Sequence, residues 1–379
     1  SQVNIITLIK NLGLKNPHKL ILRGGIDMNT KKKISFALTA CLGLFLLFPT
    51  STHAHYDRAF WYEEQVTTPH IEQYTDWMST IPDNRFLGEL AIPGTHDSMA
   101  HSNHLPFRDI VRTQTMNLQQ QLESGIRYLD IRLAYMGDHF ALYHGSIALG
   151  YQFEEVLTTI QNYLISYPSE TILMRIKQEH THASDPEMFT LFESYYQRYS
   201  SLFWNPMTSS NGYNPTLGEI RGQIVLLPDV LSIEHGINYR FVITQDQYHL
   251  NTNWDLYKKW EAIKNHINQA NTSSIDFIFM NYLSGSGGSF PYFVASGHVR
   301  PATDASRLST GLTEPGFRHR YPDFPRTARL GVFATISFEG TNTLVADYLR
   351  NNQIRRPGII ISDFPGERLI NEVIQCNYR

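Results

Sequence analysis

Reactive side chains follow short apolar runs at several places along the chain. In chain order these side chains are His96 with Asp97, Asp130 with Arg132, His144, Lys177 and Asp363. Histidine exchanges protons near neutral pH, and arginine binds anionic oxygens through a planar fork that stays charged. A site that collects these side chains could carry out acid–base chemistry on an anionic substrate.

Each of these residues also has an ordinary structural explanation. A single histidine at a strand end is commonly a hydrogen-bonded structural residue, and Asp130 with Arg132 could form a buried salt bridge. Asp97 could cap a turn, and Lys177 could be a solvated strand end. Their shared position favours one common site, because reactive groups of a parallel barrel collect past the carboxyl ends of its strands. Asp130 and Arg132 also share one face of their strand, since residues two apart point the same way.

The apolar runs alternate with helix-like stretches, which is typical of a parallel α/β fold. Strands are expected over eight runs: 87–92, 128–133, 140–143, 172–176, 224–227, 241–244, 277–280 and 358–361. Helices are expected over 153–167, 253–269 and 341–352. Eight strands of this kind predict an α/β barrel that forms a single domain.

Residues 28–54 have the three parts of an export signal. A basic stretch over 31–33 precedes an apolar run of 15 residues over 34–48, and a small-residue cleavage site ends at Ala54. We predict a secreted protein that is cleaved after Ala54. The apolar run is shorter than the roughly 20 residues that span a bilayer; an uncleaved anchor and a lipid on Cys41 are the alternatives. Residues 1–27 precede a plausible start at Met28 and are not expected in the mature protein.

The predicted mature chain, residues 55–379, has a net charge of −9. Residues 1–54 hold seven of the 32 Lys and Arg and one of the 35 Asp and Glu, which leaves 25 and 34. This acidic balance argues against nucleic acid as a partner. Cys41 lies in the predicted signal, so Cys376 has no partner for an internal disulfide. The hydrophobic core must therefore stabilise the mature chain.

The stretch from about 285 to 338 interrupts the alternation of strands and helices. Its first part is rich in Gly, Pro, Ser and Arg, and an extra strand is expected over 330–338. Between residues 297 and 331, six arginines oppose three acidic residues, and aromatic side chains lie among them. We expect an insertion on the barrel rim. Arginine with aromatic residues could dock it on an anionic membrane; a solvated loop is the alternative.

Five sequence motifs resemble those of bacterial phosphatidylinositol-specific phospholipase C, the PI-PLC X-domain family. They are "WMSTIPDNRFLGELAIPGTHDS", "YLDIRL", "YHG", "PSETILMRIK" and "SDF", and the resemblance runs from about Trp77 to Ile374. It implies a distorted (β/α)8 TIM-type barrel that cleaves phosphatidylinositol to diacylglycerol and 1,2-cyclic inositol phosphate. It also implies that no metal is needed, and we expect no other cofactor. We expect a monomer that docks peripherally on membranes containing phosphatidylinositol.

The resemblance implies a role for each reactive residue. His96 would take the proton from the inositol 2-hydroxyl, and His144 would protonate the departing diacylglycerol oxygen. Arg132 would hold the non-bridging phosphate oxygens. Calcium-dependent relatives of this fold carry an acidic ligand where this family has the arginine. A fixed guanidinium repels a divalent cation, so calcium should be unnecessary.

The other implied site residues support the catalytic groups or bind the headgroup. Three aspartates would act as supports: Asp363 for the base, Asp97 for the acid and Asp130 for the arginine. The implied inositol-binding residues are Lys177, Asp246 and Tyr248.

The sequence departs from the family pattern after the fifth strand. Residues 228–230, Pro-Asp-Val, stand where the family has an arginine that contacts the inositol ring. Arg240, on the next strand, could reach the pocket in its place. The departure leaves the orientation of the inositol ring open.

Two other functions are alternatives to the phospholipase. A metal-dependent phosphodiesterase on the same barrel would need a cluster of carboxylate ligands, and Arg132 stands in the middle of the expected cluster. A catalytically inactive lipid-binding protein would be expected to have lost a catalytic histidine, whereas His96 and His144 are both present.

Overall fold

The computed structural model describes residues 59–60, 74–299 and 307–379 of the chain. The predicted signal peptide over 28–54, its cleavage point and residues 1–27 lie outside these ranges. Within the described ranges, no helix combines the length and the apolar character that a membrane crossing requires.

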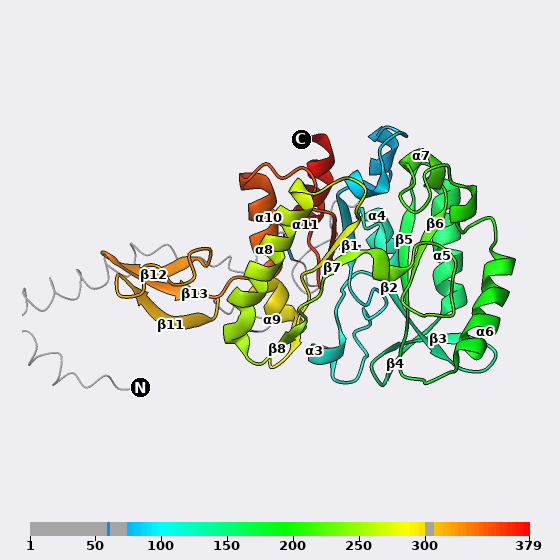
Figure 1. The fold of residues 1–379 in the computed structure, drawn as a ribbon. Helices are drawn as coiled ribbons and strands as arrows, with labels where there is room; N and C mark the ends of the chain where they lie inside the picture. The colour runs from blue at the N-terminus through cyan, green and yellow to red at the C-terminus, as the bar shows by residue number, and fades with distance from the viewer. Residues whose placement is uncertain (1–58, 61–73, 300–306) are drawn as a thin grey trace, which may run out of the picture. The chain divides into compact units, whose positions relative to one another are not determined.

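Seven parallel strands form the centre of the fold (Figure 1). In spatial order they are β6 (Ile224–Pro228), β5 (Ile172–Gln178), β2 (Tyr128–Tyr135), β1 (Ile92–Thr95), β14 (Ile359–Ser362), β9 (Phe279–Tyr282) and β7 (Ile243–Gln245). Among the described residues, β6 pairs only with β5 and β7 only with β9. The sheet is therefore a curled barrel that stays open between β6 and β7, and the predicted distorted α/β barrel is confirmed.

Helices cover the outer face of this sheet (Figure 1). The longer ones are α5 (Phe153–Ser166), α6 (Asp185–Arg198), α8 (Leu256–Thr272), α10 (Thr341–Asn351) and α11 (Glu367–Gln375). The short ones are α3 (Arg108–Val111), α4 (Leu118–Glu123), α7 (Leu217–Ile220) and α9 (Pro291–Ser296). Short 3-10 helices are η4 (Trp77–Thr80), η5 (Leu87–Glu89), η6 (Pro206–Thr208), η7 (Tyr239–Phe241), η8 (Asn253–Asp255) and η9 (Cys376–Tyr378). The three predicted helices correspond to α5, α8 and α10.

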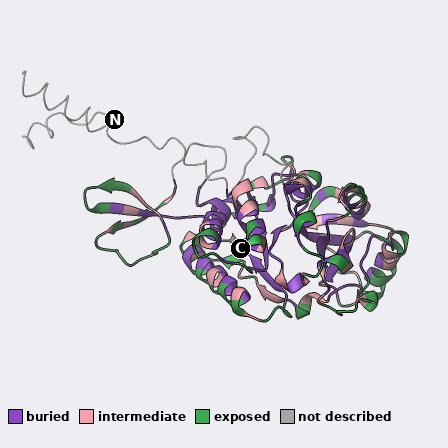
Figure 2. Cartoon of the chain, turned by 90° about the horizontal axis from the view of Figure 1, so that it is seen from above, coloured by how far each residue is buried: buried purple, intermediate pink, exposed green. Residues whose placement is uncertain are grey.

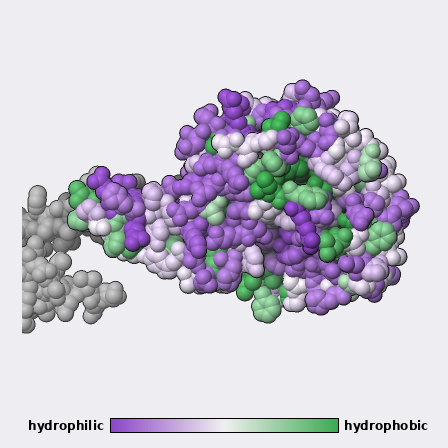
Figure 3. Space-filling model, in the orientation of Figure 1, coloured by the Kyte–Doolittle hydropathy of each residue, from purple (hydrophilic) through white to green (hydrophobic). Residues whose placement is uncertain are grey.

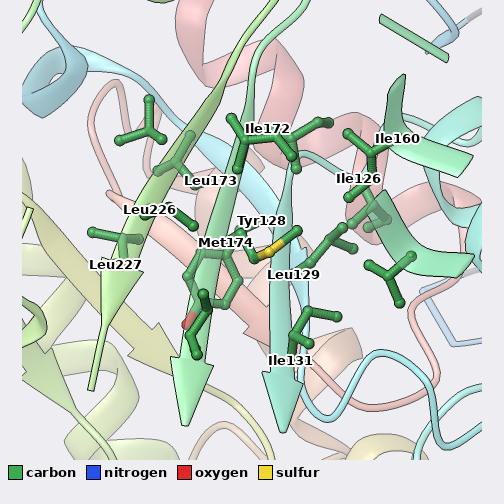
Figure 4. Close-up of a cluster of buried hydrophobic side chains, with 14 of the residues drawn as sticks. Ile126, Tyr128, Leu129, Ile131, Ile160, Ile172, Leu173, Met174, Leu226 and Leu227 are labelled. Atoms are coloured by element: carbon green, nitrogen blue, oxygen red, sulfur yellow. The ribbon is translucent and has the colours of Figure 1, made fainter. Parts of the chain in front are cut away.

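Apolar and charged side chains alternate along β2, so one face of the strand packs in the core and the other faces the interior of the barrel. Leu129 and Ile131 are fully buried and belong to one apolar cluster with Ile160 of α5 (Figure 4). Asp130 and Arg132 therefore point to the opposite, inner face, as their spacing predicts. Figure 2 shows the central strands buried, and Figure 3 shows that the outer surface over α8 is mostly hydrophilic.

The first strand was predicted too early in the chain. Residues 87–89 form η5, and β1 begins only at Ile92 and runs through Pro93. Proline lacks a backbone N–H, but no donor is needed there, because β1 pairs with β2 only from Gly94 onward. The correction places His96 directly after the strand. The strands predicted over 241–244, 277–280 and 358–361 are β7, β9 and β14, and each begins one or two residues later than expected.

The third predicted strand is not a parallel barrel strand. β3 (Phe140–His144) runs antiparallel to β2 and continues into the antiparallel β4 (Ile147–Gln152). Only residues 136–139 connect β2 to β3, and a parallel crossover needs about a dozen residues. The link is a tight turn in which Met136 N donates to the carbonyl of His139. This explains why seven parallel strands, not eight, form the barrel.

The predicted insertion contains more structure than one extra strand. It includes β10 (Ser286–Gly287), which pairs with β8 (His249–Leu250), then α9, then a three-stranded antiparallel sheet in the order β11 (Ser309–Glu314), β13 (Phe333–Ser337) and β12 (Arg326–Leu330). The strand predicted over 330–338 is divided, because Gly331 with a φ of +59° turns the chain back. Asp323, in the segment between β11 and β12, accepts hydrogen bonds from Trp260 at 2.7 Å and Lys264 at 2.6 Å, and this fastens that segment to α8.

A buried ion pair, Arg127 with Glu170, should dominate stability at the amino ends of β2 and β5. Both side chains are fully buried, with Arg127 Nη2 2.7 Å from Glu170 Oε2. Removing Glu170 leaves a buried guanidinium unpaired, which costs about 3–5 kcal/mol. We expect Glu170→Ala to lower the free energy of unfolding by that amount in urea titrations of residues 55–379. Glu154→Ala, which breaks the exposed pair with Arg198, should cost less than about 1 kcal/mol. Equal losses in the two variants would contradict the prediction.

Candidate active site

A cavity of about 330 Å³ opens at the carboxyl ends of the parallel strands. Seven of the nine predicted site residues line it: His96, Arg132, His144, Lys177, Asp246, Tyr248 and Asp363. The other two, Asp97 and Asp130, are buried and contact Arg132. The structure therefore brings all nine predicted residues to one place.

His96 is held by neighbours on both sides of its ring. Its Nδ1 lies 2.8 Å from Oδ1 of Asp363, and its Nε2 lies 2.7 Å from Nη2 of Arg132. A guanidinium only donates hydrogen bonds, so Nε2 accepts from Arg132 and the ring hydrogen sits on Nδ1, where it donates to Asp363. In this tautomer Nε2 has the lone pair that a general base needs.

The surroundings of His96 raise its pKa. Burial acts to lower it, because the interior solvates an imidazolium ion poorly. The negative charge of Asp363 and its hydrogen bond to the ring outweigh burial and the repulsion from Arg132. The pKa of His96 therefore lies above its usual value of 6.5.

Arg132 is surrounded by three carboxylates. Its Nη1 lies 3.6 Å from Asp97 Oδ2 and 3.4 Å from Glu179 Oε1, and its Nη2 lies 3.2 Å from Asp130 Oδ2. Burial acts to lower the pKa of Arg132, but the carboxylates raise it above the usual range of arginine. A fork that is held and charged in this way can bind an anionic phosphate at the cavity wall.

Asp97 connects this arginine to His144. The Oδ2 atom of Asp97 lies 3.2 Å from Nδ1 of His144, which also contacts the Val111 carbonyl at 2.7 Å. Both neighbours are acceptors, so Nδ1 of His144 carries a hydrogen. Asp97 has a φ of 41°, a strained region for a residue other than glycine, and its N–H donates to Asp130 Oδ2 at 3.1 Å. Burial raises the pKa of Asp97.

Asp130 is the fully buried carboxylate beneath the cavity. One oxygen accepts from Arg132 and from the backbone of Asp97, and the other lies 3.3 Å from Nη1 of Arg175. Burial acts to raise the pKa of Asp130, but the two guanidinium groups outweigh burial and hold the pKa well below its usual range.

The three predicted headgroup residues lie on the cavity wall. Lys177, near the end of β5, forms an ion pair with Glu179 at 3.2 Å. Asp246 directly follows β7, and Tyr248 is 59% exposed at the mouth of the cavity. These side chains offer donors, an acceptor and an aromatic face to a polar ring.

Sequence reasoning missed several residues of the site. Arg175 and Tyr282 line the cavity, and Glu179 contacts Arg132. Two of them could have been identified from strand geometry. Arg175 and Glu179 lie two residues before and after Lys177, and residues two apart on a strand point to the same face. Arg240, expected as a substitute basic residue, is exposed on η7 and does not line the cavity.

Among the described residues, no three His, Cys, Asp or Glu side chains are grouped so that they could hold a metal ion. The carboxylates behind the cavity wall face guanidinium groups. Asp97, Asp130 and Glu179 all face Arg132 at ion-pair distance.

Comparisons with known proteins connect this geometry to a family. The family model described as "Phosphatidylinositol-specific phospholipase C, X domain" matches residues 90–228. That range holds six of the nine predicted residues and leaves out Asp246, Tyr248 and Asp363.

Two curated relatives have the same name, 1-phosphatidylinositol phosphodiesterase. The protein of Listeria monocytogenes is 40% identical over 157 residues, which are 40% of this chain and 48%, about half, of that protein. The protein of Staphylococcus aureus strain Newman is 30% identical over 292 residues, which are 68% of this chain and 91% of that protein. The solved structure of phosphatidylinositol-specific phospholipase C from Listeria monocytogenes matches with a TM-score of 0.59 at 27% identity, over 80% of this chain and 98% of that one.

The pairing of His96 with Asp363 gives a testable pKa shift. Asp363→Asn removes the charge that raises the pKa of His96, so the pKa should fall below that of the wild type. The measurement is a proton NMR titration of the histidine resonances, with His96→Gln used to assign the signal. An unchanged pKa in the variant would contradict the assigned cause.

Proposed function

The chain belongs to the phosphatidylinositol-specific phospholipase C X-domain family, and from this membership we propose that it cleaves phosphatidylinositol to diacylglycerol and 1,2-cyclic inositol phosphate. The observation that carries the proposal is the placement of His96 between Asp363 and Arg132. It sets a ring nitrogen with a lone pair beside a cation that can bind phosphate.

The proposed first step is a proton transfer to His96. Once the Arg132 donor turns from Nε2 to a phosphate oxygen of the substrate, Nε2 takes the proton of the inositol 2-hydroxyl. Nδ1–H remains bound to Asp363, which stabilises the imidazolium ion. The 2-oxygen then attacks phosphorus within the same molecule, so no water molecule has to be positioned. Arg132 offsets the charge that builds on the non-bridging oxygens.

The proposed second group is His144, which lines the cavity with Nδ1 occupied by Val111 and Asp97. Its other nitrogen gives a proton to the diacylglycerol oxygen as the bond from phosphorus to that oxygen breaks. One proton enters at His96 and one leaves from His144, so the products are neutral diacylglycerol and the anionic cyclic ester.

We further propose that turnover needs no divalent metal. The Arg132 guanidinium occupies the space among Asp97, Asp130 and Glu179, and its ion pairs already balance part of the negative charge that would attract a divalent cation. A cation at this position would be repelled by Arg132.

The proposal for localisation is export, with the signal over 28–54 removed after Ala54. The basic start, the apolar run and the small-residue cleavage site support it. N-terminal sequencing of the protein recovered from culture medium tests the cleavage point.

The proposed docking surface is the rim of the cavity. Ile110 and Tyr248 line the cavity and are 54% and 59% exposed, and Phe107, at the start of α3, is 73% exposed. The arginine-rich part of the insertion supports docking less directly. None of residues 307–338 lines the cavity, and Arg307 and Arg326 form ion pairs with Glu339 and Glu314.

The reaction can be tested on phosphatidylinositol vesicles in a chelating buffer. We expect residues 55–379 to release 1,2-cyclic inositol phosphate, detected by phosphorus NMR, and His96→Ala to release at least about a hundredfold less. Activity that appears only after calcium is added would contradict the metal-independent mechanism. Comparable product from His96→Ala would contradict the assigned base.

The docking surface can be tested by vesicle co-sedimentation. The double variant Phe107→Ser/Ile110→Ser should bind phosphatidylinositol vesicles at least about tenfold more weakly, because two apolar side chains no longer enter the lipid. Arg318→Ala/Arg320→Ala, on the insertion, is the matched comparison and should bind nearly as well as wild type. Loss confined to the arginine variant would place docking on the insertion instead.

A further inference from the structure

Arg175 is a charged cavity residue that the mechanism above does not use. It lies on β5 two residues before Lys177, and its side chain is 8% exposed. It nevertheless lines the cavity that holds His96 and Arg132. A guanidinium at a cavity wall is available to a ligand.

The Arg175 guanidinium is oriented by four neighbouring side chains. Its Nη2 lies 2.6 Å from Oδ2 of Asp229, and its Nη1 donates to Asp130 at 3.3 Å and to the Tyr282 hydroxyl at 3.2 Å. The guanidinium carbon lies 4.4 Å from the ring centre of Tyr239, a cation–π contact. Nε has no hydrogen-bond partner among the described residues, so one donor remains unused.

Asp229 is the residue that sets this orientation from outside the cavity wall. It directly follows β6, its side chain is 29% exposed, and its N–H donates to the Ile176 carbonyl of β5 at 2.8 Å. Asp229 does not line the cavity. Its effect on a ligand must therefore pass through Arg175.

Arg175 is also joined to the phosphate-binding arginine. One carboxylate oxygen of Asp130 faces Arg175, and the other faces Arg132. β2 and β5 are paired so that Asp130 is opposite Arg175 and Arg132 is opposite Lys177. A change at Arg175 therefore alters what holds Arg132, whereas a change at Asp229 does not reach it directly.

We propose that Arg175 binds hydroxyl oxygens of the polyol ring of the headgroup, with Asp229 as its positioning residue and Asp130 as the link to Arg132. The inference rests on the proposed function and names the residue that orients the ring. Hydroxyl oxygens accept hydrogen bonds from a guanidinium, and the Asp130 and Asp229 carboxylates already balance the charge of Arg175. The subsite therefore suits a neutral, hydroxyl-rich ring.

The test compares a probe with a ring and a probe without one. Inositol 1-phosphate and inorganic phosphate are titrated calorimetrically into wild type, Asp229→Asn and Arg175→Gln. Asp229→Asn should weaken the binding of inositol 1-phosphate about tenfold and leave the binding of inorganic phosphate unchanged, because one charge-assisted contact that orients Arg175 is lost. Arg175→Gln should weaken both probes, because Asp130 loses one of its two cations and Arg132 shifts.

Kinetics on phosphatidylinositol vesicles give a second readout. Asp229→Asn should raise KM about tenfold and leave kcat within about twofold of wild type. The double variant Arg175→Gln/Asp229→Asn should have the same KM as Arg175→Gln alone, because Asp229 acts through Arg175. Glu193→Gln is the matched control, since Glu193 is a similarly exposed carboxylate that pairs with His235 at 2.7 Å away from the cavity. Glu193→Gln should leave the affinity for both probes unchanged.

The outcomes separate this inference from the proposed function. Wild type that releases cyclic product while Asp229→Asn binds both probes normally overturns only the role of Arg175 and Asp229. Equal weakening of both probes by Asp229→Asn also overturns it, because a general loss of structure would act that way. Wild type that neither prefers inositol 1-phosphate over inorganic phosphate nor cleaves the lipid overturns both.

Discussion

The site depends on the ion pairs that the buried carboxylate of Asp130 forms with two arginines. An unpaired charge inside a barrel is expensive, so Asp130 is stable there only because Arg132 and Arg175 face its two oxygens and the backbone N–H of Asp97 adds a hydrogen bond. The dependence is mutual, since Asp130 is one of the carboxylates that balance the charge of each arginine. Asp130 thus joins β1, β2 and β5 at the cavity floor, and it positions the guanidinium that contacts His96. The strained backbone of Asp97 is held by the same carboxylate, so Asp130 supports both Arg132 and the aspartate that contacts the proposed acid His144.

Beneath these charges, a layer of tyrosines separates the polar site from the apolar barrel. The hydroxyls of Tyr128 and Tyr282 lie 2.8 Å apart, and Tyr239 donates to Tyr282 at 3.2 Å. Burial raises the pKa of both Tyr128 and Tyr282 well above 10, so these hydroxyls stay neutral and serve as donors and acceptors. The layer needs close packing against β1, where a side chain at Gly94 would lie 2.8 Å from the Tyr128 Cβ. Tyr239 belongs to η7, just before β7, and its contact with Arg175 helps span the side where β6 and β7 do not pair.

Much of this arrangement could be predicted from the sequence, and the failures have physical causes. The alternation of apolar runs with helix-like stretches predicts the barrel. The rule that reactive groups follow strand ends gathers seven of the nine predicted residues at or directly behind one cavity, and the family resemblance adds Asp246 and Tyr248. The antiparallel β3 was mistaken for a barrel strand because its apolar pattern does not reveal its direction; only the short link over 136–139 does. Arg175 was missed because a single charge within an apolar strand has no local partner in sequence. Its partners, Asp130 and Asp229, are 45 and 54 residues away.

The same alternation that builds the core also aligns the chemistry. On β2, Leu129 and Ile131 pack in the apolar cluster, and this leaves Asp130 and Arg132 on the inner face (Figure 4). The register with β5 then sets Asp130 against Arg175 and Arg132 against Lys177. A slip of one residue in either strand would move its charges into the helix layer and its apolar side chains into the cavity. The free energy that forbids this slip comes from burying apolar side chains, so the hydrophobic core holds the charged groups within hydrogen-bonding distance. The geometry of the site is therefore a consequence of packing. Once packing has set the register, the charged side chains form ion pairs with the partners that the register places beside them.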